Sequence, residues 1–196
     1  IDKEFNERKI QLEEASKLVE KELGFPVFVK PSNSGSSVGI KKASSEEELK
    51  DAILYASKYD TKILIEEEIV GREVECAVLG TEEVIASNIG EILSAEDFYT
   101  FDAKYKNQES RVIIPAEIDN EKSEEIRKLA IKAFKAVDGF GLSRVDFFIK
   151  KSDGKVYINE INTMPGFTQI SMYPKLWEQK GIKYTELLDK LIQSAL

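Results

Sequence analysis

A predicted β-hairpin in the C-terminal third of the chain constrains the fold more than any other feature. Its two arms alternate apolar and polar residues, and they are joined across Ser152, Asp153 and Gly154. A three-residue loop with glycine at the left-handed position is a common way to close such a hairpin. Because successive side chains of a strand point to opposite faces, the register set by this loop decides which polar groups meet.

The register predicted from this loop brings the polar residues of the hairpin together in pairs. The expected pairs are Lys150 with Val156, Asp146 with Glu160, and Arg144 with Asn162. Alternation also predicts that one face of the return strand carries Val156, Ile158, Glu160 and Asn162. Arg144, Asp146 and Phe148 are expected on one face of the first strand, with Val145, Phe147 and Ile149 on the other.

The chemistry of these pairs indicates a metal site. Two carboxylates directly opposite each other repel unless something positive lies between them. Two carboxylates and an amide oxygen beside a cationic side chain suit Mg²⁺ that holds a substrate phosphate. A solvated hairpin face is the alternative, and the hairpin alone does not decide between the two.

Composition narrows the classes of function. With 196 residues, of which 42% are hydrophobic, the chain can bury a core as one domain or two closely joined lobes. Its formal net charge of −8 argues against bulk binding to nucleic acid or to an anionic membrane surface. The sequence has no histidine, which excludes Ser-His-Asp and Cys-His catalysis within this chain. The single cysteine, Cys76, alternates with valines and is expected to be a buried core thiol.

Two further observations concern the setting of the protein. No apolar run approaches the roughly 18 residues that a membrane span needs, and residues 1–20 are too charged for a signal peptide. We therefore expect a cytoplasmic protein. Because the chain starts with Ile1 rather than methionine, we also expect it to be an excerpt of a longer protein.

Periodicity and turn residues predict an α+β order of elements. The expected elements are a helix from Phe5 to Leu23, a strand from Val27 to Lys30, a loop to Ser37, a strand from Val38 to Lys42, a helix after the capping-box pair Ser45 and Glu48, a strand from Lys62 to Glu66, strands from Glu73 to about Ile92, a long loop over 95–110, a helix around Ile126 to Val137, the hairpin, and a final helix after Tyr184. The boundary between lobes is placed near Gly71.

One loop has the composition of a phosphate-binding loop. Lys30 ends a strand and leads into Pro-Ser-Asn-Ser-Gly-Ser-Ser-Val-Gly, where small residues let backbone N–H groups approach an anion. The glycine spacing and the terminal Gly-Lys-Ser/Thr of a Walker A loop are absent. A plain turn is the alternative for this loop, and a solvated acidic turn is the alternative for residues 66–73.

Several segments in order resemble the D-alanine–D-alanine ligase family of ATP-grasp enzymes. They are Val29-Lys30-Pro31, Gly35-Ser36-Ser37-Val38-Gly39, residues 66–73, Ala103-Lys104-Tyr105, Arg144-Val145-Asp146 and residues 159–168. The match runs from about Phe25 to Leu196. The resemblance implies two α+β lobes with mainly antiparallel sheets and flanking helices that clamp ATP: residues 1–72 as an N-terminally incomplete small lobe, and 73–196 as the lobe with the metal and substrate sites.

The resemblance also implies roles for single residues in the nucleotide site. Lys30 would contact the ATP phosphates, and the backbone of Ser36, Ser37 and Val38 would close over them. Glu66 and the backbone near Glu67 and Ile69 would read the adenine edge, with Glu73 on the ribose hydroxyls. Lys104 and Tyr105 would lie on a loop that closes over the γ-phosphate.

The remaining roles concern catalysis, the metal and the substrates. The implied ligands of Mg²⁺, or of Mn²⁺ in its place, are Asp146, Glu160 and Asn162. Arg144 would neutralise charge that develops during phosphoryl transfer. The Gly166 N–H would face the oxyanion, while Ser171 and the Met172 N–H would hold the carboxylate of the second substrate. Without the family, Ser171 is more simply a helix N-cap, Met172 a core residue, and the only tryptophan, Trp177, a core residue too.

The family therefore implies an enzyme with ATP and D-alanine as small-molecule substrates, in which D-alanyl-D-alanine is made through an acyl-phosphate for peptidoglycan. A homodimer of the full-length protein is a further expectation. Family members have an N-terminal domain and another ATP-binding lysine ahead of the region that begins here, so the isolated chain is expected to bind nucleotide without ligating D-alanine. Ligation of D-alanine to D-serine or D-lactate, and a non-catalytic nucleotide-binding module, are the alternatives.

Overall fold

The structure is a computed structural model that describes residues 12–93, 111–168 and 170–196. Within these ranges the chain divides into two compact units, and the division falls between Ile69 and Val70. Both units combine helices with antiparallel sheets, which confirms the predicted α+β class. None of the helices in the described ranges combines the length and apolar composition that crossing a bilayer requires.

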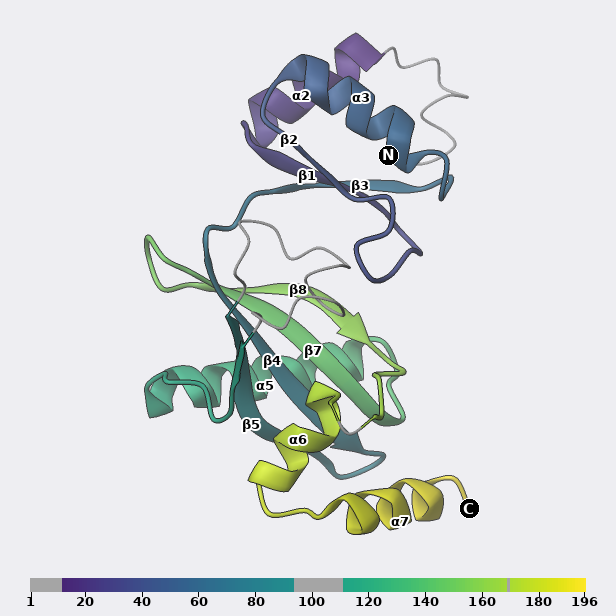
Figure 1. The fold of residues 1–196 in the computed structure, drawn as a ribbon, viewed down its shortest axis with the longest axis vertical. Helices are drawn as coiled ribbons and strands as arrows, with labels where there is room; N and C mark the ends of the chain where they lie inside the picture. Colours follow the sequence, from purple (N-terminus) through teal and green to yellow (C-terminus); the bar gives the residue numbers. More distant parts are fainter. Residues whose placement is uncertain (1–11, 94–110, 169) are drawn as a thin grey trace. The chain divides into compact units, whose positions relative to one another are not determined.

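The first unit is a three-stranded antiparallel sheet with two helices packed on one face (Figure 1). Its elements are α2 (Leu12–Glu22), β1 (Val27–Pro31), β2 (Lys41–Ala43), α3 (Glu46–Ala56) and β3 (Ile63–Glu67), and the strand order is β2-β1-β3. Apolar residues of the strands and helices form its core: Val19, Val27, Val29, Ala43, Leu49, Ala52, Ile53, Ala56 and Ile63. The alternate residues of β1, Phe28 and Lys30, are only partly buried.

The predicted capping box starts α3. The Ser45 Oγ accepts a hydrogen bond from the Glu48 N–H at 3.2 Å, and the Glu48 carboxylate accepts from the Ser44 N–H at 2.7 Å. The bond from the Glu48 side chain thus reaches the N–H of Ser44, the residue before the N-cap, and not the N–H of the N-cap Ser45 itself. Both bonds satisfy N–H groups that the start of the helix leaves without intrahelical partners.

One predicted strand of this unit is wrong in its extent. The segment from Val38 to Ile40 is not part of a strand, and β2 begins only at Lys41. The backbone φ angle is positive at Ser36 and Ser37, within the predicted loop, and again at Gly39, at +78°, within the predicted strand. The Ile40 N–H also donates to the Ser37 carbonyl at 3.4 Å, so the turn of the loop continues as far as Ile40. At Gly39 a Cβ would lie 2.6 Å from a Pro31 carbon, which leaves room for glycine alone.

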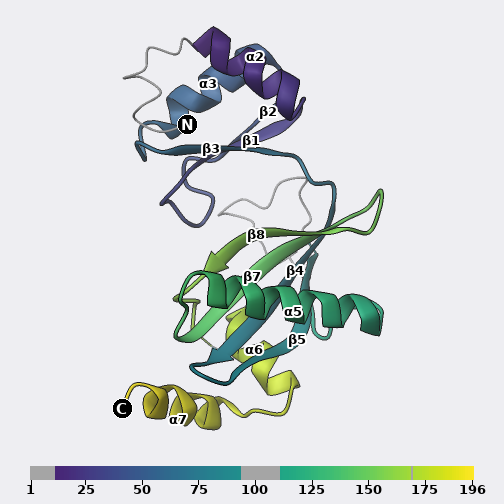
Figure 2. The ribbon, with the colours of Figure 1, turned by 180° about the vertical axis from the view of Figure 1, so that it is seen from behind.

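The second unit is a five-stranded antiparallel sheet between helices on opposite faces (Figures 1 and 2). Its elements are β4 (Gly71–Gly80), β5 (Val84–Leu93), β6 (Arg111–Ile113), α5 (Asn120–Ala136), β7 (Gly141–Lys150), β8 (Val156–Asn162), α6 (Met172–Gln179) and α7 (Tyr184–Ser194), and the strand order is β6-β5-β4-β7-β8. The predicted helices around Ile126 and after Tyr184 are confirmed as α5 and α7.

Each face of this sheet has its own cover. Helix α5 packs on the face that carries Val74, Cys76 and Val145, and it buries the Cys76 thiol completely, as predicted. Burial raises the pKa of that thiol to about 12. On the other face, a Cβ at Gly90 of β5 would lie 2.9 Å from Leu176 and 3.0 Å from the Met172 sulfur, so α6 lies against this strand. The side chain of Trp177 on α6 is fully buried, which confirms its predicted place in a core.

The β7–β8 hairpin has the predicted register at one end only. Arg144 pairs with Asn162 and Asp146 with Glu160, but Val156 pairs with Ile149 instead of Lys150. The register shifts by one residue beyond Asp146, because Asn159 is an extra residue in β8, a β-bulge.

The bulge compensates for a longer turn. The Gly154 N–H donates to the Lys150 carbonyl at 2.8 Å, and Gly154 has a φ of +69°, so the connection closes one residue earlier on β7 than predicted. Since cross-strand partners share a face, Val156 lies with Ile149 and packs on the core, not with Glu160. The predicted face of the return strand is therefore wrong for Val156 and for Ile158, which pairs with Phe147.

The capping box gives the first prediction. Ser45→Ala removes the hydrogen bond to the Glu48 N–H and is expected to lower the free energy of unfolding by about 1 kcal/mol. Ser44→Ala is the matched control, because it keeps the backbone N–H that Glu48 uses. Urea denaturation followed by circular dichroism measures both, and equal losses for the two variants would show that the Ser45 side chain does not stabilise the helix.

Candidate functional site

The predicted polar residues of β7 and β8 lie in two neighbouring rows across the second sheet. In one row Glu75 of β4, Asp146 of β7 and Glu160 of β8 are consecutive partners. In the next row Arg144 stands between Ala77 and Asn162. Three carboxylates therefore follow one another across three strands, with one guanidinium beside them.

Arg144 is held by the carboxylates around it. Its Nε and Nη2 each donate to one oxygen of Asp146 at 2.7 Å, which makes a two-point ion pair between residues on the same face of β7. Its Nε also lies 3.0 Å from the Glu75 Oε2. Because Nε carries one hydrogen and that hydrogen points to Asp146, the contact with Glu75 is one of charge rather than an aligned hydrogen bond.

Burial makes these charges strongly interdependent. The side chains of Glu75 and Asp146 are almost completely buried, and that of Arg144 is 12% exposed. Burial alone would lower the pKa of the Arg144 guanidinium. The hydrogen bonds and charge of Asp146, with the charges of Glu75 and Glu160, outweigh burial and raise that pKa overall. Arg144 is therefore a permanent cation at this place, as its predicted electrostatic role requires.

Glu75 was missed by the sequence analysis. The alternation of the strand does indicate its orientation: Glu75 lies between the core residues Val74 and Cys76, so its side chain must point to the opposite face. On that face it must meet the residue that lies across from it on the neighbouring strand. Only the pairing of β4 with β7 identifies that residue as Asp146. Glu73, which the sequence predicts to bind the ribose, lies two residues before Glu75 on the same face of β4, opposite Phe148.

Asn162 ends β8, and its amide is already oriented. The Asn162 Oδ1 accepts a hydrogen bond from the Met164 N–H at 3.2 Å. Among the described residues no group of three or more Cys, Asp and Glu side chains is arranged to hold a metal ion. The row of carboxylates does not converge on one point here, since Asp146 directs both oxygens to Arg144.

The segment after β8 brings the predicted substrate residues together. A Cβ at Gly166 would lie 2.9 Å from the Ser171 Oγ, so glycine permits a close approach of the two. Ser171 occupies the N-cap position of α6, but its side chain makes no cap hydrogen bond. The Ser171 Oγ instead accepts from the Thr168 N–H at 3.0 Å and lies 2.9 Å from the Thr168 Oγ1.

Ser171 therefore organises the loop before α6 rather than capping the helix. The Met172 side chain is buried beside Gly90, which bears out its reading as a core residue. The Met172 N–H belongs to the first turn of α6, where backbone N–H groups have no acceptor within the helix and can bind an anion.

In the first unit, two predicted nucleotide residues meet. The Lys30 Nζ and the Glu66 Oε2 form an ion pair at 2.5 Å, across the neighbouring strands β1 and β3. Val27 and Val29 of β1 point into the core, so Lys30 lies on the face away from the helices. Glu67 is exposed, and Ile69 is half-buried at the end of the unit.

The predicted phosphate loop forms a strained turn. The Val38 N–H donates to the Gly35 carbonyl at 3.1 Å, and the two residues between them, Ser36 and Ser37, both have positive φ. Such a turn normally carries glycine or asparagine, because a side chain at positive φ costs roughly 1–2 kcal/mol. Strain of this kind is concentrated at functional sites. Lys104 and Tyr105 lie outside the described residues, as does the predicted long loop at 95–110.

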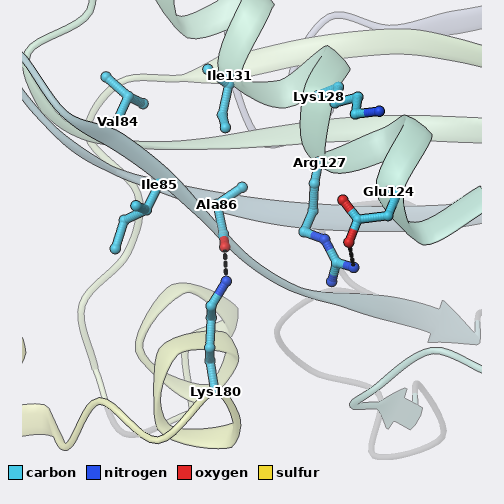
Figure 3. Close-up of a pocket in the computed structure, with 8 residues that line it drawn as sticks. All are labelled: Val84, Ile85, Ala86, Glu124, Arg127, Lys128, Ile131 and Lys180. Atoms are coloured by element: carbon cyan, nitrogen blue, oxygen red, sulfur yellow. Dashed lines mark hydrogen bonds and ion pairs between the residues drawn. The ribbon is translucent and has the colours of Figure 1, made fainter. Parts of the chain in front are cut away.

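A cavity of about 430 Å³ lies elsewhere in the second unit (Figure 3). Its lining residues are Val84, Ile85, Ala86, Glu124, Arg127, Lys128, Ile131 and Lys180. Arg127 forms an ion pair with Glu124 at 2.5 Å, and the Lys180 ammonium donates to the Ala86 carbonyl. None of the predicted site residues lines this cavity, so it is separate from the candidate site.

The chain is similar throughout to one family of proteins. The family model described as D-ala D-ala ligase C-terminus matches residues 3–193. A D-alanine–D-alanine ligase of Acetivibrio thermocellus is 59% identical over 178 residues, which are 91% of this chain and 47% of that protein. The corresponding ligase of Ruminiclostridium cellulolyticum is 53% identical over 195 residues, which are 97% of this chain and 52% of that protein.

Solved structures give the same result. The VanG D-Ala:D-Ser ligase of Enterococcus faecalis superimposes with a TM-score of 0.85 at 40% identity, over 96% of this chain and 55% of that chain. The D-alanine–D-alanine ligase of Coxiella burnetii gives a TM-score of 0.82 at 36% identity, over 95% of this chain and 49% of that chain. The predicted fold is thereby confirmed, and the chain spans about half the length of the relatives that it matches.

The strained turn gives the second prediction. Ser37→Val places a β-branched residue at a φ of +60° and is expected to lower the free energy of unfolding by about 1–2 kcal/mol. Ser37→Gly is the matched control, since glycine adopts this angle without strain. Chemical denaturation compares the two variants, and equal stability would mean that residue 37 does not hold a positive φ.

Proposed function

Since this chain belongs to the D-alanine–D-alanine ligase family and matches its C-terminal part, we propose that it is the segment of such an enzyme that binds ATP and the metal. In this proposal residues 1–72 and 73–196 are the two lobes that hold ATP. The whole enzyme joins two molecules of D-alanine in the bacterial cytoplasm and supplies a dipeptide for peptidoglycan. The row formed by the buried Glu75 and Asp146 and the exposed Glu160, beside Arg144, is the observation that carries the proposal.

The donor set of this row fits a divalent cation. Within it three carboxylates face one guanidinium, so negative charge is in excess. Asp146 and Glu160 supply carboxylate oxygens and Asn162 supplies an amide oxygen, which are the hard donors that Mg²⁺ and Mn²⁺ bind. When bound there, the ion would offset the negative charge of the ATP phosphates.

The residues of the chain then have separate tasks in the proposed reaction. Lys30, with the backbone of Ser36, Ser37 and Val38, binds the phosphates. Glu66 and the backbone near Glu67 and Ile69 bind the adenine, and Glu73 binds the ribose. The ion pair of Lys30 with Glu66 must open when each of them engages its part of the nucleotide. Lys104 and Tyr105 remain assigned to the γ-phosphate by the motif alone.

The proposed reaction has two steps. A carboxylate oxygen of the first D-alanine attacks the γ-phosphorus of ATP, and ADP leaves with the electrons of the broken bond. The amine of the second D-alanine then attacks the acyl carbon, loses a proton and expels phosphate. Arg144 stabilises the negative charge that develops in both steps, because it is a permanent cation that buried carboxylates keep beside the site.

The second substrate is bound next to Gly166 in this proposal. The Gly166 N–H donates to the oxyanion, and Ser171 with the Met172 N–H holds the substrate carboxylate at the start of α6. The close approach of Gly166 to Ser171 supports a common task for the two. The full-length enzyme is a homodimer in this proposal.

A D-alanine–D-serine ligase is the second candidate. One observation favours it: the VanG structure, which is named as a D-Ala:D-Ser ligase, matches this chain with a TM-score of 0.85. The relatives of higher identity are named D-alanine–D-alanine ligases, at 59% and 53%. D-alanine is therefore the preferred second substrate.

A substrate panel on the full-length protein tests the function. ATP-dependent phosphate release and product mass are measured with D-alanine alone, with D-alanine plus D-serine, with D-alanine plus D-lactate, and with L-alanine. We expect D-alanyl-D-alanine from D-alanine alone, and a loss of about 10²–10³-fold in turnover for Arg144→Met. Turnover that requires D-serine would favour the second candidate, and nucleotide binding without any turnover would favour a non-catalytic module.

The metal assignment gives a further prediction. Glu160→Gln keeps the size of the side chain but removes a charged ligand, so the affinity for Mg²⁺ in the presence of ADP is expected to fall at least about tenfold. Glu186→Gln on α7, which is exposed and pairs with Lys190, is the control for loss of one negative charge. Calorimetry on the full-length protein measures both affinities, and an unchanged affinity for Glu160→Gln would remove this residue from the metal site.

A further inference from the structure

Glu75 is a buried charge that the proposed roles leave unexplained. It lies in the middle of β4 with 2% of its surface exposed, and Gly90, its partner on β5, is covered by Met172 and Leu176 of α6. A buried carboxylate is costly unless a cation compensates it. Arg144 is a cation within reach, since its Nε is 3.0 Å from the Glu75 Oε2.

Asp146 cannot serve two cations equally well at once. In this structure both of its oxygens accept hydrogen bonds from Arg144 at 2.7 Å. A carboxylate that ligates a divalent ion must turn an oxygen lone pair to that ion, and a guanidinium held on the same two oxygens repels the ion. Each oxygen keeps a second lone pair, but the repulsion between guanidinium and ion means that metal binding at Asp146 is favoured when Arg144 loosens its hold.

The geometry provides a second place for the guanidinium. Glu75 and Asp146 are direct partners on adjacent strands, so their side chains share one face at the ordinary spacing of a cross-strand pair. Since Arg144 already contacts both, it can transfer its hydrogen bonds from one carboxylate to the other by turning its side chain, without movement of the backbone.

We propose that Glu75 is a positioning residue that receives the Arg144 guanidinium when Asp146 turns to the metal. Glu75 thereby frees Asp146 as a ligand and keeps Arg144 at the reacting phosphoryl group. The inference rests on the proposed function, because it presupposes that Asp146 is a metal ligand. It goes beyond that function in giving a task to a residue outside the family motifs.

Metal affinity in the full-length protein, measured with Mn²⁺ by electron paramagnetic resonance, tests the proposal. Glu75→Gln keeps the shape of the side chain but can no longer hold a guanidinium by charge, so Arg144 stays on Asp146. We expect the Mn²⁺ dissociation constant to rise by about tenfold. Glu91→Gln is the matched control, because Glu91 is a buried carboxylate of the same sheet that is paired with Arg72 and lies opposite Val74, on the other face.

A double-mutant cycle separates positioning from simple loss of charge. In an Arg144→Met background Asp146 no longer has a competitor, so adding Glu75→Gln is expected to change the Mn²⁺ dissociation constant by less than about twofold. An equal rise in both backgrounds would show that Glu75 acts through its own charge and would overturn the proposal. So would a Glu75→Gln protein that binds Mn²⁺ as tightly as the wild type.

Two further variants keep the outcome decisive. If Glu75→Gln does not fold, Glu75→Asp replaces it. This variant keeps the charge but has a shorter side chain, which moves the carboxylate away from Arg144. Weaker Mn²⁺ binding is again the expected result. Asp146→Asn tests the premise. If it leaves Mn²⁺ affinity unchanged, the metal site of the proposed function fails and this inference fails with it, whereas a weakened Asp146→Asn beside an unaffected Glu75→Gln overturns the inference alone.

Discussion

The second unit depends on a conflict of charge that its sheet creates. Antiparallel pairing places Glu75, Asp146 and Glu160 side by side on three successive strands, where like charges destabilise the pairing. Arg144 relieves part of that repulsion from the neighbouring row, and it does so out of water, where each charge has more effect. A sheet designed only for stability would place apolar residues here. The excess of carboxylates is consistent with a row that is completed by a cation from outside the chain.

The cost of this arrangement is reduced by the rest of the unit. Helix α5 packs on the opposite face and buries Val74, Cys76, Val145 and Phe147, so each of these strands is anchored by apolar residues that alternate with the charged ones. Helix α6 covers the charged face beside Gly90. The same strands therefore hold an apolar core on one face and a polar row on the other, where Arg144 lies between the buried carboxylates of Glu75 and Asp146.

The sequence predicts the functional end of the hairpin, but for a partly wrong reason. A three-residue loop predicts that Asp146 faces Glu160, and it does. The real connection closes one residue earlier, and the bulge at Asn159 restores the register before Glu160 is reached. Two irregularities of one residue cancel, and alternation in a single sequence reveals neither of them. The same limit applies after Val38, where the positive φ of Gly39 extends the turn of the loop into the predicted strand.

Long-range pairing accounts for what sequence reasoning missed. Glu75 stands in a strand whose alternation is plain, but its importance depends on a partner 71 positions later in the chain, which only the order of strands β4 and β7 reveals. The ion pair of Lys30 with Glu66 is similar, because the two residues were assigned to different parts of a nucleotide and only the pairing of β1 with β3 brings them together. Motifs identify which residues matter, whereas the sheet decides which of them meet.

The most direct test is a crystal structure of the full-length protein with Mn²⁺ and ADP, with the ion located by its anomalous scattering. We predict an anomalous peak bound by Asp146, Glu160 and the Asn162 amide oxygen, with the Arg144 guanidinium turned from Asp146 to Glu75. A peak at other residues, with the two hydrogen bonds between Arg144 and Asp146 intact, would contradict the account.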